Sequence, residues 1–124
     1  MERWCDPETR QAVVDEFGEI GDWDVSAVTD MRRLFLNRRE FNEDLSRWDT
    51  RSVLKMGGMF GYASSFNQPV EAWTTSSVVN MQQMFWNASS FNQSVEAWDT
   101  GRVEDMGLIF NGVRSFNQHP SWLR

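Results

Sequence analysis

The sequence predicts a right-handed α/β repeat solenoid of about four 25-residue repeats, each with a short parallel strand and a short helix. Tryptophan, methionine and phenylalanine each recur at this spacing. The matching positions are Trp23, Trp48, Trp73 and Trp98; Met31, Met56, Met81 and Met106; and Phe35, Phe60, Phe85 and Phe110. Phe-Asn pairs at 41–42, 66–67, 91–92 and 116–117 follow the same period. A fixed period between about 20 and 50 residues is typical of repeats that stack around one continuous core.

Residues 1–22 precede the repeats and are predicted to form a helical cap. Asp6 suits the N-cap of a helix, and Pro7 suits its first turn. The apolar residues that follow at helical spacing are Ala12, Val13 and Phe17. We therefore expect a helix at about 7–17, ending at Gly18 or Gly21, whose apolar side covers the first repeat.

The first part of each repeat reads Phe-Asn-x-x-(Leu/Val)-x-x-Trp and predicts a short strand. The strand is centred on Leu45, Val70 and Val95 in successive repeats, with these side chains pointing inward and their neighbours outward. Strands one repeat apart are expected to pair in parallel and to form a narrow sheet along the solenoid.

The second part of each repeat predicts a helix of two to three turns. Val78, Met81, Met84 and Phe85 lie at offsets 0, 3, 6 and 7, which place them on one helical face. The other repeats keep these offsets. The aspartates that precede the helices are Asp24, Asp49 and Asp99. They favour turn capping, because a calcium site would need the glycine-rich Asp loop that is missing here.

The repeats extend over 23–118 and leave a C-terminal tail at 119–124. Trp122 falls one residue short of the tryptophan period, so the last repeat either slips in register or is capped. Three outcomes stay open for this end: closure by Trp122 and Leu123, edge pairing with another molecule, or continuation in a longer array.

The net charge of −6 is unevenly distributed along the 124 residues. Residues 1–25 carry eight acidic groups against two arginines, whereas 26–55 carry seven basic groups against five acidic ones. The acidic total argues against nucleic acid as the main partner. The sequence shows neither a transmembrane run nor a signal-peptide pattern, and Cys5, the single cysteine, cannot form an internal disulfide.

The repeated Phe-Asn-Gln, Trp-Asp-(Thr/Val)-Ser, Val-x-x-Met and Met-Phe motifs resemble the BspA-like leucine-rich repeats, in particular the DUF285 repeats. The stretch FGEIGDWDVSAVTDMRRLF resembles the start of such arrays, and the likeness covers about 9–118. It implies a curved, leucine-rich-repeat-like solenoid that binds partners, at the cell surface or secreted in some members. It brings no catalytic residues, cofactor or metal.

Two surfaces are candidates for binding a partner. Trp86 lies outside the repeated core positions, and with Arg32, Arg33, Gln82 and Gln83 it is expected to make a mixed basic and aromatic patch on the helical side. Packing of Trp86 against Leu36 or a neighbouring loop is the alternative. The outward strand side forms a second, polar and acidic surface. Its residues include Gln68, Gln93, Glu71 and Glu96.

These observations favour a non-enzymatic protein–protein interaction or structural scaffold module, which could be a subunit within a larger assembly. The alternative is a cell-surface adhesin that binds carbohydrate through exposed aromatic rings, and a spacer without a partner is a third reading. Cys5 and His119 are expected at opposite ends of the molecule, too far apart for catalysis. Glu71 and Glu96 have the spacing of a glycosidase carboxylate pair, but we expect both to be simply exposed.

Overall fold

The computed structural model describes residues 5, 6 and 8–123, and it differs in class from the predicted α/β solenoid. Within those residues the chain has one α-helix, α2 (Arg10–Phe17), and one 3-10 turn, η1 (Ile20–Asp22). The same residues form no β-strand, only isolated parallel bridges that join positions 30, 55, 80 and 105. The predicted fold class is therefore wrong, because most of this backbone lies in turns and irregular structure.

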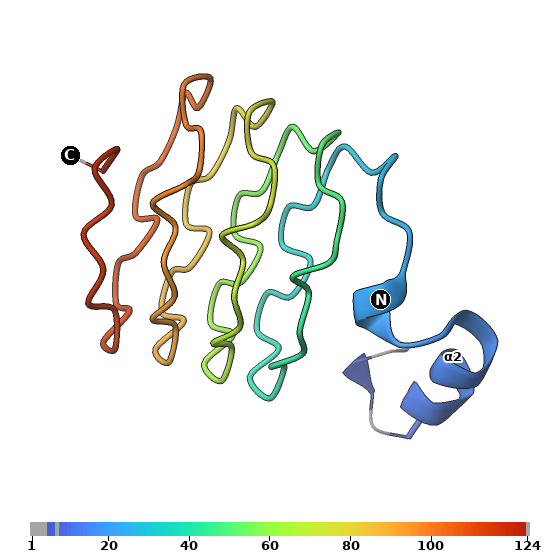
Figure 1. Ribbon diagram of the computed structural model, residues 1–124. Coiled ribbons are helices and arrows are strands. Elements are labelled where there is room, and N and C mark those ends of the chain that lie inside the picture. Colours follow the sequence, from blue (N-terminus) through green and yellow to red (C-terminus); the bar gives the residue numbers. More distant parts are fainter. Residues whose placement is uncertain (1–4, 7, 124) are drawn as a thin grey trace.

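Four similar loops of chain lie side by side between α2 and the C-terminus (Figure 1). We call these loops rungs. Rung 1 is 23–47, rung 2 is 48–72, rung 3 is 73–97 and rung 4 is 98–122. α2 lies at one end of this stack, beside rung 1, and rung 4 lies at the other end.

One side of each rung bonds to the next through its backbone. We call the stretches that do so ladder segments, and they are 31–37, 56–62, 81–87 and 106–112. In the first three, every second N–H donates to a carbonyl of the following rung, at N···O distances of 2.7–3.0 Å. Met31, for example, donates to Lys55, and Arg33 donates to Gly57.

The ladder segments occupy the positions predicted as helices, and turns form there instead. The N–H of Leu34 bonds to the carbonyl of Met31, and that of Leu36 to Arg33, so the segment is a series of short turns. Arg33 and Asn37 have φ values of 59° and 64°. This left-handed conformation is what the third residue of a type II turn requires, and it ends any α-helix. The offsets 0, 3, 6 and 7 thus place side chains inward without a helix.

The predicted strands at Leu45, Val70 and Val95 are also turns. The N–H of Trp48 bonds to the carbonyl of Leu45, and the later rungs repeat this turn. On this side the rungs are joined by side chains. Asn42 Oδ1 accepts the N–H of Asn67 at 2.8 Å, and Asn67 Oδ1 accepts the N–H of Asn92 at 2.9 Å. No backbone ladder is needed here because the asparagine amides take its place.

The core is a set of stacked aromatic rows inside the rungs. Phe60 stacks on Phe35 and Phe85 with ring centroids 5.5 Å away in both directions, and all three rings are fully buried. The indole N–H of Trp73, the first residue of rung 3, donates to the carbonyl of Leu45 near the end of rung 1 at 2.9 Å, and Trp98 of rung 4 bonds in the same way to Val70 of rung 2. The predicted inward positions of the Trp, Met and Phe columns are correct for the inner rungs.

The N-terminal helix is shorter than predicted and begins three residues later. α2 starts at Arg10 with Thr9 as its N-cap, while the Asp6 carboxylate accepts the N–H of Glu8 instead. Pro7 lies outside the described residues. The helix stops before Gly18, as predicted. Val13 is buried, but Phe17 is 56% exposed and meets Trp23 edge-on, so the apolar side of the helix is narrower than expected.

The C-terminal end is partly closed by Trp122. Its ring stacks on Trp98 at 6.3 Å and its indole N–H donates to the carbonyl of Val95, so it fills the tryptophan position despite the missing residue. Pro120 begins the final turn, in which the N–H of Leu123 bonds to the Pro120 carbonyl. In rung 4 Trp98 and Ile109 are buried, whereas Met106, Phe110 and Phe116 remain only partly buried.

Candidate functional site

Glycines in rung 2 bring side chains of rung 1 toward those of rung 3. A Cβ on Gly58 would lie 3.3 Å from Cγ of Arg33, and a Cβ on Gly61 would lie 2.8 Å from Cδ1 of Leu36. The stems of Arg33 and Leu36 therefore lie over rung 2, where any larger residue at position 61 would collide with Leu36. The two glycines thus leave room for the Arg33 and Leu36 side chains over rung 2.

Trp86 is half-buried and packs edge-on against Tyr62 of rung 2, with ring centroids 5.1 Å apart. The Tyr62 N–H donates to the Trp86 carbonyl at 2.7 Å, so the backbone also holds the two residues together. The aromatic pair was not foreseen from the sequence, although Tyr62 is the single tyrosine and departs from the Asn or Gly found at equivalent positions. Trp86 contacts a neighbouring rung and still keeps part of its surface open.

The two arginines of the predicted patch differ in their electrostatics. Arg32 forms an ion pair with Asp30 at 2.8 Å, and the hydrogen bonds from its side chain and backbone lower the pKa of the Asp30 carboxyl to about 2. Arg33 is exposed and has no ion-pair partner among the described residues. The patch therefore presents one free positive charge, at Arg33.

Gln82 is exposed and Gln83 is half-buried in rung 3. Gln83 has a φ of 57°, the left-handed conformation that Arg33 has in rung 1. The ladder segments of rungs 1 to 3 thus place Arg32, Arg33, Gln82, Gln83 and Trp86 on one side of the molecule. We call this surface, together with Leu36 and Tyr62, the ladder face.

The second predicted surface uses its side chains to join rungs. Gln68 Nε2 donates to the carbonyl and the Oδ1 of Asn42, at 3.1 and 3.2 Å. Gln93 makes the same pair of bonds to Asn67 one rung further on. The polar character of this surface was predicted correctly, but these amides are engaged within the fold.

The two glutamates on that surface are likewise bonded to serines. Glu71 accepts a hydrogen bond from the Ser94 hydroxyl, and Glu96 accepts bonds from the hydroxyl and the N–H of Ser121 at 2.7 and 2.9 Å. The bond from the Ser121 hydroxyl is the main cause that lowers the pKa of Glu96. A general acid in a glycosidase needs a raised carboxyl pKa, so this environment opposes such a role.

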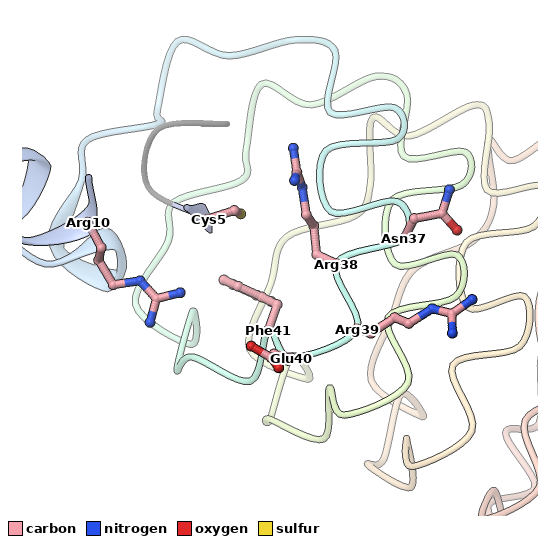
Figure 2. Close-up of a pocket in the computed structure, with 7 residues that line it drawn as sticks. All are labelled: Cys5, Arg10, Asn37, Arg38, Arg39, Glu40 and Phe41. Carbon is pink, nitrogen blue, oxygen red and sulfur yellow. The ribbon is translucent and has the colours of Figure 1, made fainter. Parts of the chain in front are cut away.

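A hollow that the sequence did not indicate lies between the N-terminal segment and rung 1 (Figure 2). It has a volume of about 300 Å³ and is lined by Cys5 and Arg10 on one side and by 37–41 on the other. Burial raises the pKa of the Cys5 thiol, while the positive charges of Arg38 and Arg10 act in the opposite direction. The thiol therefore stays protonated at neutral pH and is a weak nucleophile.

The aspartates before the ladder segments cap turns, as predicted. Asp24, Asp49 and Asp99 each accept, through Oδ1, the N–H two residues further on, at 2.9–3.1 Å. In the part of the chain that the structure describes, no three His, Cys, Asp or Glu side chains are grouped closely enough to hold a metal ion. That part also contains no helix with the length and apolarity needed to cross a membrane.

Comparison with known proteins matches the chain to a protein family. The model of a family described as "Mycoplasma protein of unknown function, DUF285" matches residues 8–122, which confirms the resemblance drawn from the repeated motifs. No curated protein and no solved structure was found to match the chain.

Proposed function

The chain belongs to the DUF285 family, and from the composition of its ladder face we propose that it is a non-enzymatic module that binds another protein. The observation that carries the proposal is the Tyr62–Trp86 pair, two half-buried rings in edge-on contact on the ladder face, which also carries the exposed Arg33. Tryptophan, tyrosine and arginine are the residues most enriched at the energetic centres of protein interfaces.

The ladder face is a better candidate than the polar surface on the opposite side. Gln68 and Gln93 donate to neighbouring rungs, and a partner would have to compete with those bonds. On the ladder face the side chain of Arg33 is available, and the rings are already held by their rung contacts. Such preorganised anchors lose little conformational freedom on binding. The free guanidinium favours a partner that presents carboxylates.

Photo-cross-linking in cells of the source organism tests this proposal. The photoreactive residue p-benzoylphenylalanine is placed at the position of Trp86 and, in a control chain, at the position of Phe17, an exposed aromatic residue on α2. We expect one partner chain to cross-link reproducibly from position 86 and not from position 17. The yield should fall several-fold when Arg33→Ala is added. Equal patterns from both positions would contradict binding through the ladder face.

Carbohydrate binding by the same rings is the second candidate. It is favoured by the half-exposed state of both Tyr62 and Trp86 on one surface, since sugars stack on accessible aromatic rings. Glycan-array binding that is lost in Trp86→Ala and retained in Phe17→Ala would support an adhesin. An array without binding, together with a protein cross-link from position 86, would support the protein-binding module.

A further inference from the structure

The ladder segment of rung 4 carries a row of backbone N–H groups that have no acceptor within the described residues. The N–H groups of Met106, Leu108, Phe110 and Gly112 have no hydrogen-bond partner among the described residues. In each of rungs 1 to 3 the four equivalent N–H groups donate to the following rung. The last ladder segment therefore has the bonding capacity of the others without a neighbour to use it.

The first ladder segment has the complementary row. In rungs 2 to 4 the carbonyls at four alternate positions accept the bonds from the preceding rung. The equivalent groups in rung 1 are the carbonyls of Asp30, Arg32, Leu34 and Leu36, and none of them accepts a hydrogen bond within the described part of the chain. A hollow of about 370 Å³ adjoins Asp30, Arg32 and Arg33 at one end of this row. At the other end, Cys5 and Arg10 face 37–41 across the hollow in Figure 2.

Apolar surface accompanies the donor row. Leu108 is 52% exposed, and the rings of Phe110 and Phe116 are only partly buried, whereas their equivalents Phe85 and Phe91 are fully buried. A further layer of the same construction would cover this surface. Burial of apolar surface is the main favourable term in most protein association.

The direction of the hydrogen bonds decides how two chains can meet. The bonds from the four alternate N–H groups of each ladder segment all run to carbonyls of the next rung, whereas bonds just before the ladder, such as that from the Val79 N–H to the Leu54 carbonyl, run the opposite way. Two rung 4 edges would bring donor to donor, so a symmetric dimer through this end cannot form the bonds. A donor row needs an acceptor row with the same alternate spacing, and rung 1 of a second copy provides one.

We propose that the chain self-associates head to tail, with the N–H groups of Met106, Leu108, Phe110 and Gly112 donating to the carbonyls of residues 30, 32, 34 and 36 of the next copy. The register follows from the internal rungs, in which Arg33 donates to Gly57 and Phe35 donates to Met59. This contact uses different surfaces on the two copies, so it leads to open chains of molecules rather than closed dimers.

The register also places one particular pair of side chains together. Leu108 of one copy takes the position next to Arg33 of the following copy, as Arg33 and Gly58 are neighbours within one chain. Arg33, Gln83 and Leu108 all have φ between 57° and 59°. Arginine and glutamine already adopt this conformation at the equivalent positions of rungs 1 and 3. A long polar side chain at position 108 therefore adds no new backbone strain.

Sedimentation velocity over a wide concentration range tests the proposal through charge at position 108. The wild-type chain is expected to show concentration-dependent growth beyond a dimer. Leu108→Glu should raise the association constant about 2- to 5-fold relative to Leu108→Gln, because the carboxylate meets Arg33 of the next copy. Leu108→Arg should lower it by a similar factor.

The double variant distinguishes this register from other contacts. Adding Arg33→Glu to Leu108→Arg should restore association, whereas Arg33→Glu added to Leu108→Glu should cancel the gain and weaken association, because two carboxylates then meet. High salt should reduce all of these charge effects. A wild-type chain that stays monomeric at every concentration, a closed dimer, or charge variants that change association without this reciprocal pattern would each overturn the proposal.

Discussion

The asparagine row offers the cleanest test of how the rungs are joined, because the same residue occurs in rungs with and without a following neighbour. Asn67 Oδ1 accepts the N–H of Asn92 at 2.9 Å and Nε2 of Gln93 at 3.0 Å. Asn117 is its equivalent in rung 4, and its side chain makes no hydrogen bond to the described residues. Asn67→Ala removes two bonds between rungs, whereas Asn117→Ala removes none.

Each hydrogen bond contributes about 0.5–1.5 kcal/mol net, and Asn67 is exposed to water, which favours the lower part of that range. We therefore expect Asn67→Ala to lower the free energy of unfolding by about 1–2 kcal/mol. With a urea m-value of about 2 kcal/mol/M, the urea concentration at the unfolding midpoint falls by about 0.5–1 M. Asn117→Ala should change the free energy by less than about 0.5 kcal/mol.

Urea unfolding followed by tryptophan fluorescence, at a protein concentration low enough to keep the chain monomeric, provides the comparison. Asn67→Asp is a third variant that keeps the acceptor oxygen, and it should retain most of the stability at pH 7. Equal losses in Asn67→Ala and Asn117→Ala would show that the amide acts within its own rung, and the reasoning would fail.

Three other substitutions test the core, a close approach and an ion pair. Trp73→Ala should cost about 3–5 kcal/mol in thermal or urea unfolding, while Trp73→Phe, which loses the indole hydrogen bond and part of the buried ring, should cost about 1–3 kcal/mol. Gly57→Ala places a Cβ 2.2 Å from Oδ1 of Asn80 and should cost about 1–3 kcal/mol, with part of this loss recovered in Gly57→Ala/Asn80→Ala. The pKa of Asp30 is lowered to about 2 by its bonds from Arg32, so its contribution to stability is present above about pH 4 and lost as the pH falls toward 2. Asp30→Asn should therefore be less stable than wild type at pH 6, with a gap that shrinks to a small part of this value as the pH falls to about 2, and a gap that stays undiminished between pH 6 and pH 2 would contradict this assignment.

The inward positions could be predicted from the sequence, whereas the backbone conformation could not. Burial follows residue type, so a 25-residue period in tryptophan, methionine and phenylalanine identifies the core whatever path the backbone takes between them. Spacings of three, three and one residues fit a helical face, and they equally fit a series of short turns. The helical interpretation was wrong because the N–H groups in these segments bond to the next rung.

The left-handed residues left a partial signal in the sequence. Gly58 and Gly112 mark the two positions per rung at which φ is positive, and Asn37 and Asn87 are among the residues that tolerate this conformation. Arg33 and Leu108 occupy the same positions in other rungs and conceal the pattern. Comparing all four rungs position by position, with glycine and asparagine given more weight, would have indicated turns.

The candidate surface was predicted in part. Trp86 stood out because it departs from the repeat, and the structure places it beside rung 2 on the same side as Arg33. Its contact with Tyr62 could not be derived, because the predicted helix gave position 62 no defined relation to position 86. The strand interpretation likewise concealed that Gln68 and Gln93 would donate to the preceding rung.

The one-way hydrogen bonds between ladder segments align peptide dipoles along the axis of the stack. Each peptide unit carries a dipole of about 3.5 D, and in helices such alignment creates a positive N–H end and a negative carbonyl end. Here the carbonyl end lies at rung 1, where Arg32 and Arg33 are found, and the N–H end lies at rung 4, beside Glu104 and Asp105. The exposed Arg33 at one pole and the exposed Glu104 and Asp105 at the other thus carry charges that oppose the backbone field that the ladder bonds create.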